Sequence, residues 1–146
     1  MIISHRGVSF DLPENSLPAF NAAWEYGVDG IEGDFHLTKD GVIVCIHDED
    51  TKRVCNHKLI IKDSTLEELK QLNLSYKDSK NSKVKIPTLA EVLKVLPSNK
   101  KIYIEIKCGV EIIKPLIKEL SRFKIDSDQA VIISFDENII KEFKLE

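Results

Sequence analysis

Apolar residues along this 146-residue chain follow two spacings that alternate from one segment to the next. Apolar runs bounded by turn residues are typical of strands, and apolar residues three and four positions apart are typical of helices. The runs predict strands at residues 2–4, 28–38, 42–47, 101–107 and 130–135. The helical spacing predicts helices that start near Ser16, in 64–68, in 87–91, near residue 112 and after Asp136.

Capping residues support several of these helix starts. Ser16 can cap the first helix, and Gly27 suits its C-terminal end. Residues 64–68 and 87–91 each hold a hydroxyl residue and a glutamate at capping-box spacing. Pro115 lies inside the 112–123 pattern, so the regular helix is expected to begin near it or to be kinked there.

The order of the elements predicts an α/β fold with a parallel sheet. Strands alternate with helices, and the second strand has a hairpin partner. Polar residues fall at the C-terminal ends of several strands, which is the active-site face of a (β/α)8 barrel, so a TIM-barrel type is expected. Residues 48–87 form a longer polar, lysine-rich excursion from this pattern.

Size and charge narrow the function classes. One domain is expected for this length, and the net charge of -3, with lysine and arginine scattered among the acids, gives no support for nucleic-acid binding. No apolar run approaches the ~20 residues of a membrane span, and no secretory signal is visible, so a cytoplasmic location is expected. The 3 cysteines match neither a disulfide framework nor a zinc motif.

Carboxylates inside predicted strands are the strongest chemical signal. Glu32 and Asp34 are two positions apart, so their side chains point to the same face, and Glu105 alternates with isoleucines in residues 101–107 in the same way. A surface antiparallel strand could alternate like this without any function. In a sheet covered by helices, however, buried carboxylates need a partner, and three of them suit a hard cation such as Mg²⁺ or Ca²⁺.

Two histidines each end an apolar strand. His5 follows residues 2–4, and His47 follows residues 42–46. A single strand-end histidine is more often structural than catalytic, but a pair beside a carboxylate cluster can act as general acid and base. His36 shares the face of Asp34 and is expected to line the site or orient a ligand, whereas His57 is expected to be solvated.

Basic residues complete the predicted site. Arg6 offers a fork of donors suited to phosphate, and Lys107 offers a compact positive charge. A cation, two basic side chains and a histidine pair together indicate phosphoryl-ester chemistry. No glycine-rich nucleotide loop is present in the sequence, so use of ATP or GTP is not expected.

Seven short motifs occur in the order in which the glycerophosphodiester phosphodiesterase family carries them, and the sequence resembles the N-terminal half of that family. The motifs are His5-Arg6-Gly7, Pro13-Glu14-Asn15-Ser16, Gly30-Ile31-Glu32-Gly33-Asp34, Thr38-Lys39-Asp40-Gly41, Ile46-His47-Asp48, Ile86-Pro87-Thr88-Leu89 and Ile104-Glu105-Ile106-Lys107. The resemblance implies a TIM barrel that hydrolyses glycerophosphodiesters to glycerol 3-phosphate and an alcohol.

The resemblance also implies roles for individual residues. Glu32, Asp34 and Glu105 would hold a divalent cation (Mg²⁺ or Ca²⁺), and His5 and His47 would be the acid–base pair. Arg6 and Lys107 would contact phosphate, Glu14 and Asn15 would shape the loop beside the metal, and residues 48–87 would be a small insertion that covers the site. Three places depart from the family pattern: Ser16 replaces the commoner threonine, Gly33 replaces a larger apolar residue, and residues 56–58 replace a glycine-containing turn.

Length is the main departure, because a TIM barrel takes about 250 residues. The chain is expected to form one domain, residues 1–146, that holds about the first four βα units, a half barrel truncated at its C-terminus. Half a barrel leaves two parallel strand edges unpaired, so a truncated piece, a fragment of a longer gene product and a homo-oligomer that closes the ring are all consistent with the sequence. Alternative functions are an inactive fragment that binds metal and phosphate, and a related phospholipase-type phosphodiesterase.

Overall fold

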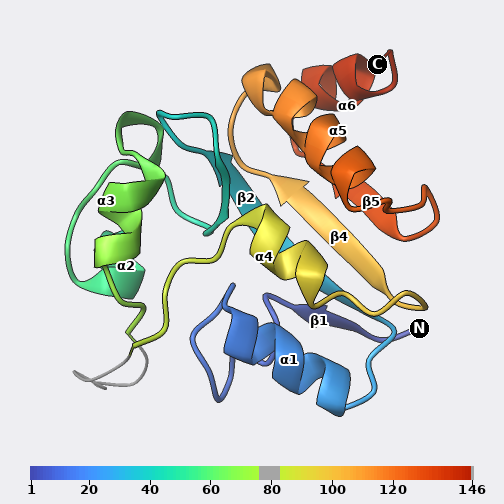
Figure 1. Cartoon of the computed structure of the whole chain (residues 1–146), viewed down its shortest axis with the longest axis horizontal. Helices are drawn as coiled ribbons and strands as arrows, with labels where there is room; N and C mark the ends of the chain where they lie inside the picture. The colour runs from blue at the N-terminus through green and yellow to red at the C-terminus, as the bar shows by residue number, and fades with distance from the viewer. Residues whose placement is uncertain (76–82, 146) are drawn as a thin grey trace.

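A central, largely parallel sheet organises the computed structural model, which describes residues 1–75 and 83–145 (Figure 1). Within these residues the strands run in the order β1-β2-β4-β5, and β3 pairs with β2 outside this path. The parallel strands are β1 (Ile3–His5), β2 (Gly30–Leu37), β4 (Lys101–Ile106) and β5 (Ala130–Ile133). The antiparallel strand β3 (Ile43–Cys45) forms the predicted hairpin with the second half of β2, and the prediction of an α/β fold with a parallel sheet is confirmed.

Four helices pack on one face of this sheet around the main core. They are α1 (Leu17–Glu25), α4 (Leu89–Lys94), α5 (Ile113–Arg122) and α6 (Glu137–Phe143). Ile31, Phe35 and Ile104 point from the strands into this core, where Phe20 of α1 and Leu116 of α5 meet them, all fully buried. The alternation along β2 and β4 therefore sends apolar side chains towards the helices and the carboxylates towards the opposite face, as the pattern predicted.

Register between the parallel strands aligns the polar positions. His5 lies opposite Glu32 in the β1–β2 pair, and Asp34 lies opposite Glu105 in the β2–β4 pair. Side chains at directly paired positions of neighbouring strands lie on the same face, so the register brings the polar ends of three strands together.

Residues 48–75 and 83–87 form a separate lobe beside β3 with its own small core. The lobe contains α2 (Lys52–Cys55), a 3₁₀ turn at Ile61–Asp63 and α3 (Leu66–Gln71). Its buried apolar residues are Val54, Ile61, Leu69, Leu74 and Ile86, which pack on Val44 and Ile46. The sequence predicted α3 but neither α2 nor the 3₁₀ turn, because one-turn elements have no apolar periodicity. Part of the polar 48–87 segment, residues 76–82, lies outside the described residues.

Helix ends agree with the predicted caps. Ser16 and Asp136 accept hydrogen bonds from first-turn amides, and Thr65 and Thr88 form complete capping boxes. Helix α5 begins two residues before Pro115, so the missing amide hydrogen of this proline falls in the first turn, where no helical bond is lost. Across the described residues, every helix is too short or too polar to cross a membrane.

Candidate metal and phosphate site

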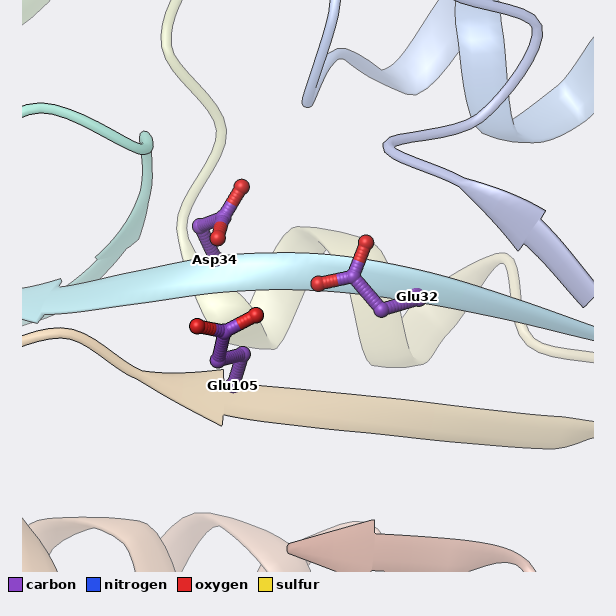
Figure 2. A group of neighbouring side chains, drawn as sticks. All are labelled: Glu32, Asp34 and Glu105. Carbon is purple, nitrogen blue, oxygen red and sulfur yellow. The ribbon is translucent and has the colours of Figure 1, made fainter. Parts of the chain in front are cut away.

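Three carboxylates converge on the polar face of the sheet (Figure 2). Glu32 and Asp34 project from β2 and Glu105 from β4, and each offers an oxygen that lies within 4.8 Å of the oxygens offered by the other two. Asp34 is fully buried and Glu32 is 7% exposed. The structure therefore brings together the three acidic residues that the strand pattern selected.

Unsatisfied oxygens in this cluster fit a cation. Glu32 Oε1 and Asp34 Oδ1 are buried without a hydrogen-bond partner. Burial, with the neighbouring charges of Asp34 and Glu105, raises the pKa of Glu32 to about 7. Three neighbouring carboxylates, two of which keep a buried oxygen without a hydrogen bond, suit a hard divalent ion such as Mg²⁺ or Ca²⁺, so the residues present fit such an ion.

Arg6 leaves strand β1 and turns back over the cluster. Its backbone is left-handed (φ 57°), and its amide donates to the Glu32 carbonyl over 3.0 Å. Its Nε lies 3.0 Å from Asp34 Oδ2, and Nη1 donates to Glu14 Oε1 over 3.2 Å. The next residue, Gly7, also has a positive φ and lies so close to Ala19 that a Cβ atom would stand 2.7 Å from its carbonyl carbon.

Asn15 fixes Asp34 from the loop before α1. It is buried, its backbone is left-handed (φ 54°), and its Nδ2 donates to Asp34 Oδ2 over 2.9 Å. In return the Asp34 amide donates to Asn15 Oδ1 over 3.2 Å. Asn15 therefore orients the side chain of Asp34 and also holds the backbone of strand β2 at that position.

Lys107 supplies the second positive charge, at the end of β4. Its Nζ donates to Glu105 Oε1 over 2.9 Å and lies 3.8 Å from Asp34 Oδ1. The lysine and Arg6 thus approach different oxygens of the same aspartate, and both are about four-fifths buried. A hollow of about 250 Å³ next to Lys107 is lined also by His36, Glu49 and Glu111.

Histidines occupy different positions around the cluster. His5 is largely exposed, and its Nε2 lies 3.8 Å from Glu32 Oε2. His47 is held by Asp48, with Nδ1 2.7 Å from Asp48 Oδ1. His36 contacts this segment: its Nε2 donates to the His47 carbonyl over 3.0 Å, and burial lowers the pKa of its ring. His57 is exposed in the lobe, as expected.

Two contacts in this region were not anticipated among the site residues. Asp48 pairs with His47, and Arg53 of α2 forms hydrogen bonds to both Asp48 and Glu14. These bonds hold the pKa of Asp48 down at about 2 and lower the pKa of Glu14. Asp48 directly follows His47 in the motif Ile46-His47-Asp48, so the sequence contained a signal for this contact. Arg53 lies in a polar segment without any marker, and only the fold brings it to Glu14.

Most of the chain is similar to known proteins. The model of the glycerophosphoryl diester phosphodiesterase family matches residues 5–144. A glycerophosphodiester phosphodiesterase from Caldanaerobacter subterraneus is 39% identical over 150 residues, which cover 99% of this chain and 61% of that protein. The chain thus spans less than two thirds of the length of this relative.

Solved structures show the same correspondence. A glycerophosphodiester phosphodiesterase from Thermotoga maritima superposes with a TM-score of 0.82 at 37% identity, covering 99% of this chain and 58% of that one. A phosphodiesterase from Oleispira antarctica, in complex with the product sn-glycerol-3-phosphate, gives a TM-score of 0.91 at 29% identity and covers 99% and 61%. The strand and helix order described above is therefore shared with enzymes that act on phosphodiesters.

Proposed function

The chain belongs to the glycerophosphoryl diester phosphodiesterase family, and from this membership we propose that it carries the catalytic half of an enzyme that hydrolyses glycerophosphodiesters. The products would be glycerol 3-phosphate and an alcohol. One observation carries the proposal. The carboxylates of Glu32, Asp34 and Glu105 lie together with two largely buried, positively charged side chains, Arg6 and Lys107. His5 lies beside them.

Glu32, Asp34 and Glu105 would hold the divalent cation of this reaction, Mg²⁺ or Ca²⁺. The two unpartnered oxygens, Glu32 Oε1 and Asp34 Oδ1, support this assignment. When bound, such an ion supplies Lewis-acid polarisation of a phosphate oxygen. Asn15 would keep Asp34 oriented for the ion, in the manner of the outer-shell partners that orient metal ligands elsewhere.

Arg6 and Lys107 would bind the phosphate group of the substrate. Both side chains already lie against Asp34, so their positive charges are held at the cluster in fixed positions. Donors fixed in advance stabilise charge that develops on phosphate oxygens during the reaction without a cost of reorganisation. Glu14, which accepts from Arg6, would keep the guanidinium in place.

His5 and His47 would transfer the protons. One takes the proton of the attacking oxygen, and the other gives a proton to the leaving alkoxide. The attacking oxygen is that of water or of the neighbouring glycerol hydroxyl, and both routes need the same acid–base pair. His36 would support the segment of His47, because it binds the carbonyl of that residue.

The described sheet corresponds to the first part of a TIM barrel in this proposal. Residues 1–146 would be one domain that holds about four βα units, and 48–87 would be its small insertion over the site. The matched relatives are longer than this chain, which covers 61% of the Caldanaerobacter protein and 58% of the Thermotoga protein. The proposal also includes the activity of the whole enzyme, a homo-oligomer that covers the strand edges, and a cytoplasmic location.

Release of glycerol 3-phosphate from glycerophosphocholine tests the function. The assay is run with Mg²⁺ or Ca²⁺, with EDTA, and with Glu32→Ala as the matched variant. Metal-dependent release that both EDTA and the variant abolish is the expected result. Folded, metal-loaded protein that releases nothing would contradict activity of this chain by itself.

A second function, binding of metal and phosphate without turnover, is favoured by the 61% coverage of the Caldanaerobacter relative. Calorimetric titration with Ca²⁺ and glycerol 3-phosphate separates the two: binding without release supports this second function. A phospholipase-type substrate is the third candidate, and parallel assays with lysophosphatidylcholine and glycerophosphocholine distinguish it from the first.

A further inference from the structure

We infer that Arg53, in the lobe outside the sheet, is a positioning residue that fixes both His47 and Arg6 through one acidic partner each. The inference rests on the proposed function for the roles of His47 and Arg6 in the reaction. The contacts of Arg53 that support it do not depend on that function. Arg53 lies on the four-residue helix α2, far along the chain from Glu14, and its half-exposed side chain pairs with two carboxylates from outside this helix.

The Arg53 guanidinium is engaged on two sides. Nη1 and Nη2 donate to Glu14 Oε2 and Oε1 over 2.9 and 2.8 Å, a bidentate pair. Nε and Nη2 donate to Asp48 Oδ2 and Oδ1 over 2.7 and 3.1 Å, a second bidentate pair. Only the planar fork of arginine can serve two carboxylates in this way, and a lysine ammonium at the same place would hold them as a point charge without fixing their planes.

The first consequence concerns the tautomer of His47. Asp48 has a pKa of about 2, so its carboxylate is ionised and can only accept. The atom 2.7 Å from Asp48 Oδ1 must therefore be an N–H donor, which places the proton on His47 Nδ1. Nε2 is then the atom left to exchange protons with a substrate. Arg53 maintains this state because it prevents Asp48 from rotating away.

The second consequence concerns Arg6. Glu14 accepts from Arg53 through both oxygens and from Arg6 Nη1 through Oε1 over 3.2 Å. Arg6 in turn lies 3.0 Å from Asp34 Oδ2. A continuous series of ion pairs thus runs from the carboxylate cluster through Arg6, Glu14, Arg53 and Asp48 to the ring of His47. The lobe and the sheet meet at the site through this series.

Side-chain ¹⁵N NMR spectra of the four histidines test the inference without any need for activity. The variants are Arg53→Gln, Arg53→Lys and Asp48→Asn, and His47→Gln identifies the signal of His47. Arg122→Gln is the control, because Arg122 is an exposed arginine with one carboxylate partner, Glu119, at 3.4 Å. Thermal melting curves show whether each variant is folded. If Arg53→Gln does not fold, Arg53→Lys takes its place in the comparison.

The expected spectrum of the unaltered chain is that of a fixed Nδ1–H tautomer at His47. Arg53→Gln and Asp48→Asn should shift it towards a mixture of tautomers, Arg53→Lys should lie between, and Arg122→Gln should leave it unchanged. A His47 signal that is the same in all folded variants would overturn the inference.

If the chain hydrolyses glycerophosphodiesters, the kinetics of this reaction give a second measurement. Arg53→Gln is expected to lower kcat about 10- to 100-fold, the range found for partners of site residues, with KM changed much less. Partial recovery in Arg53→Lys would support a positioning role. Absence of turnover in the unaltered chain would count against the proposed function, whereas the tautomer of His47 would still decide the role of Arg53.

Discussion

Asn15 and Asp34 hold each other through two reciprocal hydrogen bonds, one from the Asn15 side-chain amide to Asp34 Oδ2 (2.9 Å) and one from the Asp34 backbone amide to Asn15 Oδ1 (3.2 Å). Asp34 is fully buried and Asn15 is 2% exposed. A carboxylate that is removed from water keeps its charge only where donors surround it. The pair therefore decides how the innermost carboxylate of the cluster is oriented.

Replacement of Asn15 by alanine should weaken both stability and metal binding. Loss of the two bonds to a buried carboxylate should cost about 2–4 kcal/mol of unfolding free energy, and metal affinity should fall about tenfold or more. Urea denaturation and Ca²⁺ titration measure the two effects. Asn56→Ala is the matched control, because Asn56 has the same left-handed backbone (φ 57°) on an exposed loop. Equal losses in both variants would refute the role of the Asn15 side chain.

Removal of one carboxylate should change the response of the protein to divalent cations. An ion that binds only the folded state raises Tm by mass action, so Mg²⁺ or Ca²⁺ should stabilise the unaltered chain. Glu32→Gln should lose this response and, because one repelling charge is removed, should be at least as stable as the unaltered chain in EDTA. Glu67→Gln on the exposed part of α3 is the control. A cation-induced rise in Tm that persists in Glu32→Gln would contradict the assignment.

Gly7 should not tolerate a side chain. A Cβ atom at Gly7 would lie 2.7 Å from the Ala19 carbonyl carbon, and its φ of +76° adds backbone strain. Gly7→Ala is expected to cost at least about 3 kcal/mol, since overpacking and a left-handed alanine both contribute. Gly41→Ala isolates the second effect, because Gly41 has φ +78° and nothing within 4 Å. Its expected cost is about 1–2 kcal/mol. Similar Tm values for the two variants would show that α1 can move away from this turn.

Gly33 adapts the sheet to α1. A Cβ atom there would stand 3.1 Å from Cys45 Sγ and 3.3 Å from Phe20 Cζ, so Gly33 lies on the face of β2 that packs against the helices. Gly33→Val should destabilise the chain by about 1–3 kcal/mol, because the added methyl groups overpack this core. In the background of Phe20→Leu the same change should cost less, and a double-mutant cycle by urea denaturation measures the difference. Additive costs would mean that Phe20 does not limit the space.

Asp48 should contribute to acid sensitivity. Arg53 lowers the pKa of Asp48 from 3.8 to about 2, so the folded carboxylate holds its proton less tightly than the unfolded one. The stabilisation is fully present above pH ~4 and is lost as the pH falls through about 2. Its size is at most about 2 kcal/mol, and less in salt, because the side chain is partly exposed. Urea denaturation at pH 7 and pH 3 should show a smaller pH effect in Asp48→Asn than in Asp128→Asn, an exposed control. Equal pH effects would argue against this linkage.

The sheet and the carboxylate cluster were predictable from the sequence because both depend on period-two alternation. Glu32 and Asp34 have the same parity in a strand whose other face is apolar, and Glu105 lies on the neighbouring strand in the same way. Parallel register then brings them together without any further information. The capping boxes were readable for the same reason, since their residues are local in sequence.

The ion pairs around the cluster were not predictable in this way. Arg53 and Glu14 are 39 positions apart, and their contact depends on how a lobe with its own core packs beside β3. The left-handed backbones of Arg6 and Asn15 are equally hidden, because neither residue type demands such a conformation. Local patterns predict which side chains share a face, but contacts between segments that lack periodicity require the folded chain.

Strand β2 pairs with three other strands: β1 along its first half, β3 along its second half and β4 from Gly30 to Phe35. A shift of one residue in the pairing of Gly30–Leu37 with its neighbours would turn Glu32 and Asp34 towards Phe20 and would bring Ile31 and Phe35 to the polar face. Sequence drift in this family is therefore expected to change the length of the loops and of the lobe after His47, and to leave the spacing within these eight positions unchanged.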